Sequence, residues 1–174
     1  MNDAPDFSQT DDEPRLLPLR GSGEQTGLRR LIEDLVAEAA AERRTRSLPS
    51  VPVEIDIAEG HATAFDADSL RAVLLPLLRA ACQSAALARG AASDRRRFSE
   101  VVVTSVDTGT AIEIEVADSA PESADEFPAM ALALTKARAF AERCGGQVAL
   151  AACPEGGLAV TLRIPQRRAR GMAA

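Results

Sequence analysis

The sequence predicts an α+β protein, a two-layer sandwich with helices on one face of a mixed, mostly antiparallel sheet. Two observations support this. Short runs with alternating apolar residues come in pairs joined by polar turns, and three longer stretches carry apolar residues at helical spacing. Their order is α, β, β, α, β, β, α, β, β, and we expect the strands of each pair to be antiparallel. The 174 residues suffice for one domain with short tails.

The first helix is expected at 28–44, and Thr26 is a candidate for its N-cap. Its apolar residues recur at positions i, i+3, i+4 and i+7, which defines one buried stripe: Leu28, Leu31, Ile32, Leu35, Val36 and Ala39. This stripe has two alternative uses, packing against its own domain or forming the seam of a homodimer.

The first strand pair is expected at 53–57 and 61–65, before a long apolar helix at 68–88. Asp66 or Asp68 is the expected N-cap of that helix. A proline lies inside it at position 76 and is expected to kink it, because proline lacks an N–H and clashes with the preceding turn.

The second half of the chain repeats a simple plan of hairpin, helix and hairpin. The first hairpin pairs 100–106 with 111–117, and the second pairs 147–153 with 158–164. The helix between them is expected at 129–144, where two consecutive glycines end it.

We assign residues 27–165 to one domain, which includes the first helix. Residues 1–26 carry six acidic residues, two arginines and little apolar periodicity, so we expect a disordered acidic tail. Residues 166–174 form a short basic tail.

Composition excludes several classes of function. A net charge of −6, with five Phe and no Trp or Tyr, argues against nucleic-acid binding. One histidine and three widely spaced cysteines argue against a metal site. The N-terminus is acidic and polar, and no apolar run approaches the roughly 20 residues that span a bilayer. We therefore expect a cytoplasmic protein without membrane contact.

Three stretches together carry a family resemblance: "FDADSLRAVLLPLLRAACQSA" at 65–85, "IEVADSAPES" at 114–123 and "AMALALTKARAFAERCGGQV" at 129–148. Their order and spacing resemble the ATP-binding domain of sensor histidine kinases, within the GHKL superfamily, whose architecture is the Bergerat fold. The resemblance covers about residues 28–165.

The resemblance assigns nucleotide-site roles to particular positions. Asp118 aligns with the Asp that accepts a hydrogen bond from the adenine amino group. Ala80 occupies the position of the asparagine that binds magnesium, and alanine has no oxygen ligand to offer. The aligned glycine positions, where the family's backbone approaches the nucleotide, all hold other residues: Ala120, Glu122, Ala129, Ala131 and Ala133. Alanines favour continuing the helix, so we expect the phosphate-cradling loop to be lost.

The resemblance therefore implies a degenerate kinase-type domain with vestigial nucleotide-site positions and neither ATP nor magnesium as a cofactor. Our leading hypothesis is a non-catalytic adaptor that binds a signalling protein, such as a response regulator or a kinase. One alternative is a divergent ATP-binding kinase of the histidine kinase or anti-sigma type. A second is a histidine phosphotransferase using His61, although that histidine lies beside a strand and the chain shows no helical hairpin to carry it.

Some charged residues keep more than one interpretation. Asp118 is a ligand contact, a solvated loop acid or a cap for the next segment. Lys136 and Arg138 are either a solvated helix face or an anion site. The acidic residues that alternate along the strands are better explained as the outward face of the sheet than as paired catalytic carboxylates: Glu54, Asp56, Glu113 and Glu115.

Overall fold

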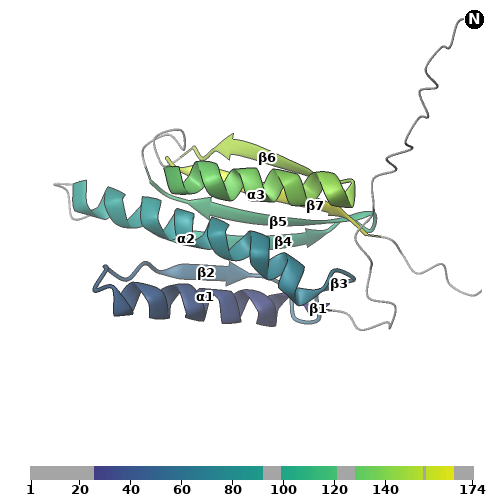
Figure 1. The fold of residues 1–174 in the computed structure, drawn as a ribbon, viewed down its shortest axis with the longest axis horizontal. Coiled ribbons are helices and arrows are strands. Elements are labelled where there is room, and N and C mark those ends of the chain that lie inside the picture. The colour runs from purple at the N-terminus through teal and green to yellow at the C-terminus, as the bar shows by residue number, and fades with distance from the viewer. Residues whose placement is uncertain (1–25, 92–98, 121–127, 155, 167–174) are drawn as a thin grey trace, which may run out of the picture.

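The computed structural model describes residues 26–91, 99–120, 128–154 and 156–166. Within these ranges the chain forms three helices and seven strands (Figure 1). The helices are α1 (Leu28–Thr45), α2 (Ala67–Ala91) and α3 (Pro128–Cys144). The strands are β1 (Thr26–Gly27), β2 (Val53–Asp56), β3 (Ala62–Thr63), β4 (Val101–Asp107), β5 (Ala111–Asp118), β6 (Gln147–Ala152) and β7 (Leu158–Pro165).

Five strands form the main sheet in the order β2-β4-β5-β7-β6. The predicted hairpins β4–β5 and β6–β7 are both present and antiparallel, and β5 also pairs antiparallel with β7. The expectation of antiparallel pairs throughout is wrong for β2, which runs parallel to β4. The cause is α2, a crossover helix between the two strands, since parallel neighbours need such a connection.

The strand predicted at 61–65 is shorter in the structure, where it is β3, and it is not part of the main sheet. It pairs with β1 in a separate two-stranded sheet, where Thr26 faces Thr63. The prediction that Thr26 caps α1 is also wrong. Gly27 is the N-cap and has no side chain with which to make a capping bond, and the Thr26 hydroxyl donates to the carbonyl of Phe65, at 2.8 Å.

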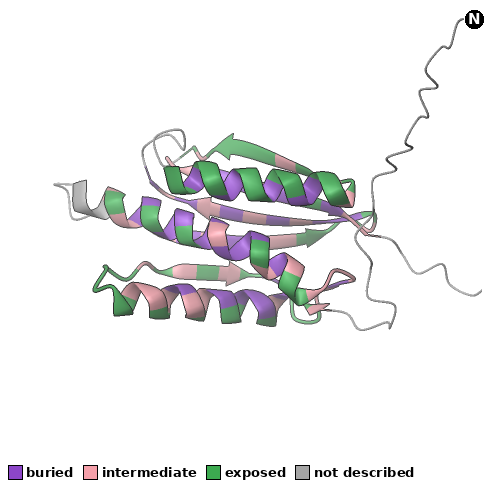
Figure 2. Cartoon of the chain, in the orientation of Figure 1, coloured by how far each residue is buried: buried purple, intermediate pink, exposed green. Residues whose placement is uncertain are grey.

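The three helices lie on one side of the main sheet, which confirms the predicted two-layer sandwich (Figure 1). The core lies between the layers, and the largest fully buried side chains include Leu28, Leu74, Ile114 and Phe140. The apolar stripe of α1 is buried within the chain, against α2 and β2, except that Val36 is only partly buried (Figure 2 colours the chain by burial). This helix packs on its own domain, and its apolar stripe is not free to form a dimer seam.

The helix ends follow the sequence signals closely. The Asp66 carboxylate accepts a hydrogen bond from the backbone N–H of Ser69, at 2.9 Å, so Asp66 caps α2 as predicted. At the end of α3, Gly145 adopts φ +70° and Gly146 donates to the carbonyl of Ala141 at 2.7 Å, the bonding of a Schellman cap. The helix α2 continues through Pro76.

By length and composition, the segment Ala67–Ala88 of α2 would be apolar enough to cross a membrane, with a mean hydropathy of 1.3. The expectation that no apolar run approaches this length is therefore wrong. A buried core helix passes the same test, and 61% of this window is buried inside the fold. The acidic tail before Thr26, the basic tail from residue 167 and the DRRR stretch at 94–97 lie outside the described residues.

Candidate functional site

Asp118 is the last residue of β5 and points toward the helices. Side chains two residues apart in a strand share one face, and Ile112, Ile114 and Val116 on this face are all buried. Asp118 continues that series and is only 4% exposed. A carboxylate so placed must find its hydrogen-bond donors within the protein.

The donors around the Asp118 carboxylate come from three segments. The backbone N–H of Ala120 donates to Oδ1 at 2.9 Å, and the hydroxyl of Ser84 on α2 lies 3.4 Å from the same oxygen. The backbone N–H of Leu158, at the start of β7, also bonds to the carboxylate. Burial raises the pKa of Asp118 above its ordinary value, and these donors oppose that rise.

The strand β7 begins in direct contact with this corner. Gly157, with φ +99°, comes so close that a Cβ atom built on it would overlap the backbone carbonyl of Asp118. Only glycine fits both the conformation and the approach. Asp118 therefore joins the end of β5, the middle of α2 and the start of β7, a role that the sequence analysis did not predict.

Ala80 lies on α2 one helical turn before Ser84, so the two residues share one face of the helix. Both are buried, at 4% and 6% exposure. A methyl group thus fills the interior at the position where the resemblance places a magnesium ligand. Sequence reasoning missed Ser84, although a polar residue four positions after Ala80 in an otherwise apolar stretch is the signal that could have identified it.

The three alanines after β5 that occupy aligned glycine positions all lie within a regular helix. The helix α3 starts at Pro128 and includes Ala129, Ala131 and Ala133, as expected from the high helix propensity of alanine. Ala133 is buried in the interface below α3, whereas Ala129 and Ala131 are exposed. Ala120 is buried, at 1% exposure, and Glu122 lies outside the described residues.

The remaining candidates do not join this cluster. His61 lies just before β3 and not on a helix, and its ring Nδ1 is 3.3 Å from the Ser105 hydroxyl. Lys136 and Arg138 are exposed on α3. The strand acids behave as an outward face: Glu113 pairs with Arg163 at 3.4 Å, and the other three are exposed or half-buried. Within the described residues, no group of His, Cys, Asp or Glu is arranged to hold a metal ion.

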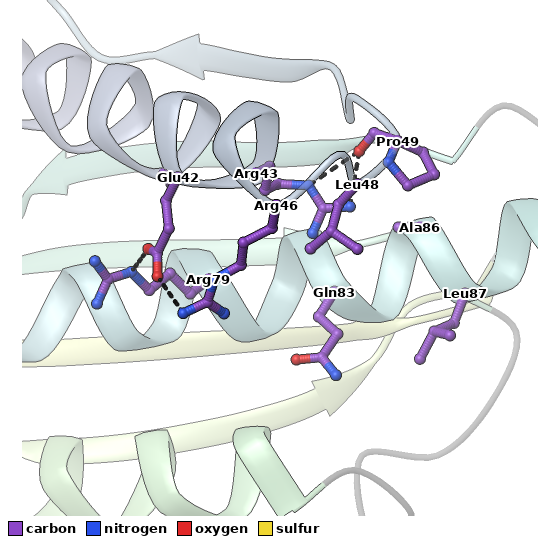
Figure 3. Close-up of a pocket in the computed structure, with 10 residues that line it drawn as sticks. Glu42, Arg43, Arg46, Leu48, Pro49, Arg79, Gln83, Ala86 and Leu87 are labelled. Carbon is purple, nitrogen blue, oxygen red and sulfur yellow. Dashed lines mark hydrogen bonds and ion pairs between the residues drawn. The ribbon is translucent and has the colours of Figure 1, made fainter.

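A groove of about 350 Å³ lies between the end of α1 and the second half of α2, and we call it the α1–α2 groove (Figure 3). Its lining residues are Ala39, Glu42, Arg43, Arg46, Leu48, Pro49, Arg79, Gln83, Ala86 and Leu87. Leu48 and Leu87 are about half exposed, at 46% and 51%. Sequence reasoning missed this groove.

Arginines dominate the charge of the α1–α2 groove. Glu42 binds two of them, Arg46 at 3.0 Å and Arg79 at 2.7 Å, through different carboxylate oxygens. The guanidinium of Arg43 donates to the backbone carbonyl of Pro49 at 2.8 and 3.0 Å, and it makes no salt bridge with a carboxylate of the described residues. The lining therefore has three arginines and one glutamate, in a chain whose net charge is −6.

Comparison with solved structures identifies the fold. The nucleotide-free catalytic domain of histidine kinase ThkA superposes with a TM-score of 0.59 and 17% identity, over 82% of this chain and 96% of that domain. A second crystal form of that domain gives 0.58 and 18%, with the same coverage. Acinetobacter baumannii histidine kinase AdeS gives 0.58 and 15%, over 83% of this chain and 68% of AdeS. No protein-family model and no curated protein sequence matches the chain. The chain has the fold of a histidine kinase catalytic domain.

Proposed function

We propose that this protein is a non-catalytic histidine-kinase-like domain that acts as an adaptor in a two-component-type signalling pathway. It binds neither ATP nor magnesium and works by contacting another signalling protein, such as a response regulator or a kinase, in the cytoplasm. The observation that carries the proposal is the hydrogen bonding of Asp118. Its carboxylate already accepts bonds from Ser84, Ala120 and Leu158.

An adenine-reading carboxylate must have a lone pair directed at the ligand. Asp118 is 4% exposed and its carboxylate accepts bonds within the protein, so an adenine amino group has little access to the lone pairs that remain. Ala80 adds no oxygen for magnesium.

The helical conformation of the glycine-position alanines supports the same proposal. Phosphate groups are commonly held by backbone N–H groups of a glycine-rich loop that precedes a helix. Here α3 already includes Ala131 and Ala133, and N–H groups inside a helix are bonded to its own carbonyls. The alternative, a divergent ATP-binding kinase, would need this part of α3 to unwind.

The α1–α2 groove is the surface that we assign to the partner. Its excess of arginines selects an acidic partner surface, and the half-exposed Leu48 and Leu87 offer apolar contacts beside the charges. A partner with an apolar side chain flanked by carboxylates would match both features. Arginine is one of the residues enriched in binding hot spots.

Calorimetric titration with Mg-ATP tests the loss of nucleotide binding. We expect no saturable heat, and a Kd tighter than about 100 μM would overturn this part of the proposal. An ATPase assay and an autophosphorylation assay on the same sample should both give no product.

The partner assignment is tested with purified response regulators and kinases encoded beside this gene. We expect one of them to bind, and Arg46→Glu combined with Leu87→Ala to weaken that binding by about tenfold or more. Arg138→Glu is the matched control, because Arg138 is an exposed arginine on α3, away from the groove. Equal loss in the control, or none in the groove variant, would contradict the assignment.

A further inference from the structure

One edge of the main sheet is a strand without charge. Among the described residues, the strand β6 pairs only with β7, so its other side is an open edge of the described sheet. Its sequence is QVALAA, and every residue except Val148 is exposed. The opposite edge, β2, has exposed acidic residues at Glu54 and Asp56. Edge strands are normally protected by charges, prolines or bulges, and β6 has none of these.

The backbone groups that β6 presents at this edge follow from its register. The N–H of Cys153 donates to the carbonyl of Gly157 at 3.0 Å, one step beyond the pairing of Ala152 with Leu158. Bonded and non-bonded pairs alternate along an antiparallel ladder, so Ala149 and Ala151 also bond to β7. The intervening residues therefore direct their N–H and C=O groups away from β7: Val148, Leu150 and Ala152. No hydrogen bond between described residues reaches these groups.

We propose that β6 pairs antiparallel with β6 of a second copy of this chain, with Leu150 on the two-fold axis. The N–H and C=O of Leu150 then exchange bonds with Leu150 of the second copy, and Val148 bonds with Ala152 of the second copy. The outward groups recur every second residue, as this register requires. The five-stranded sheet continues into the second copy's sheet.

The uncharged sequence favours a second copy as the occupant. A two-fold axis at Leu150 places this residue opposite its own copy, so a charge there would face a like charge across the axis. Leu150 carries no charge, and neither does any other residue of β6. Leu150 is 38% exposed on the face shared with Val148 and the buried Val160, its partner on β7. Pairing covers it with Leu150 of the second copy.

Sedimentation equilibrium over a range of concentrations tests the pairing. Because a single strand edge is a small interface, we expect a reversible dimer with a Kd of roughly 1–100 μM. Leu150→Lys places two like charges on the axis and should raise that Kd at least about tenfold. Val106→Lys is the matched control, since it introduces the same charge at an exposed aliphatic residue of β4, 56% exposed and away from the β6 edge, and should dimerise like the wild type.

Amide exchange measured by NMR gives a second, residue-level test. In the dimer the amides of Val148, Leu150 and Ala152 should be protected, and dilution should release them while Ala149 and Ala151 stay protected by β7. A wild type that is monomeric at all concentrations overturns the proposal, as does a Leu150→Lys variant that dimerises normally. The edge lies apart from the α1–α2 groove, so partner binding can fail while dimerisation persists, or the reverse.

Discussion

Replacing Asp118 with alanine tests whether this carboxylate is a structural acceptor or a free ligand contact. The substitution leaves the N–H groups of Ala120 and Leu158 and the hydroxyl of Ser84 without their acceptor. A hydrogen bond to a charged group contributes about 1.5–3 kcal/mol, and an unsatisfied buried donor costs about 1–3 kcal/mol. Relief of the buried charge offsets part of this loss, and the Ser84 contact is long, at 3.4 Å. We therefore expect Asp118→Ala to lower the free energy of unfolding by about 2–4 kcal/mol.

Urea denaturation followed by circular dichroism measures this change, with Asp118→Asn as the matched variant. Asparagine keeps one acceptor oxygen for the N–H of Ala120, so its loss should be smaller, about 1 kcal/mol. If Asp118→Ala unfolds within about 0.5 kcal/mol of the wild type, Asp118 is not a structural acceptor. The carboxylate would then be available to a ligand, and the reasoning behind the proposed function would fail.

The difference in stability between the wild type and Asp118→Asn should change with pH in a defined direction. The folded pKa of Asp118 is raised above its ordinary 3.8, so the folded state holds the proton more tightly than the unfolded state. The stability from this difference is fully present below pH 3.8 and is lost as the pH rises through the folded pKa. The wild type should therefore lose stability relative to Asp118→Asn as the pH rises through this window. A difference that is flat with pH would contradict the raised pKa.

Three further substitutions test the local geometry by thermal and urea unfolding. Gly157→Ala should lower the free energy of unfolding by roughly 3 kcal/mol or more, because its Cβ would overlap the carbonyl of Asp118. Gly60→Ala, also at positive φ but in open space, should lower it by only about 1 kcal/mol. Equal effects of the two substitutions would contradict the close approach of Gly157 to Asp118. Asp66→Ala should cost about 1 kcal/mol through loss of the α2 cap, and an unchanged midpoint would mean that the cap contributes nothing. Ala80→Asn should cost about 1–3 kcal/mol by burying an amide, and restored magnesium binding without that cost would contradict the buried site.

Local signals in the sequence were sufficient for most of the fold. The spacing of apolar residues placed α1, α2 and α3 within a few residues of their ends, because each helix buries one stripe. The glycine pair after α3 and the aspartate before α2 acted as predicted, since capping depends on residues next to each other in the chain.

The predictions failed where contacts between segments distant in the sequence determine the local structure. Thr26 is a good capping residue, but its hydroxyl donates to the carbonyl of Phe65, which lies 39 positions away in the sequence. Nothing in the sequence of β2 shows that its neighbour is β4, because the crossover through α2 sets that pairing.

The candidate site was predictable only in part. Alternation along β5 already places Asp118 on the buried face, although we interpreted it as a ligand contact, a solvated loop acid or a cap; the solvated interpretation is wrong, because Asp118 is 4% exposed. Its partners could not be predicted, because Ser84 and Leu158 approach from elements 34 and 40 positions away in the sequence. The α1–α2 groove is also a product of packing, formed where the ends of two helices and the turn after α1 meet.

Calorimetric titration of the wild-type protein with Mg-ATP tests the central claim most directly. The account predicts heats equal to those of dilution, because Asp118 is bonded internally and Ala80 offers no magnesium ligand. A saturable isotherm with a Kd tighter than about 100 μM would contradict it. If Asp118→Asn then abolished that binding, Asp118 would be a working nucleotide contact.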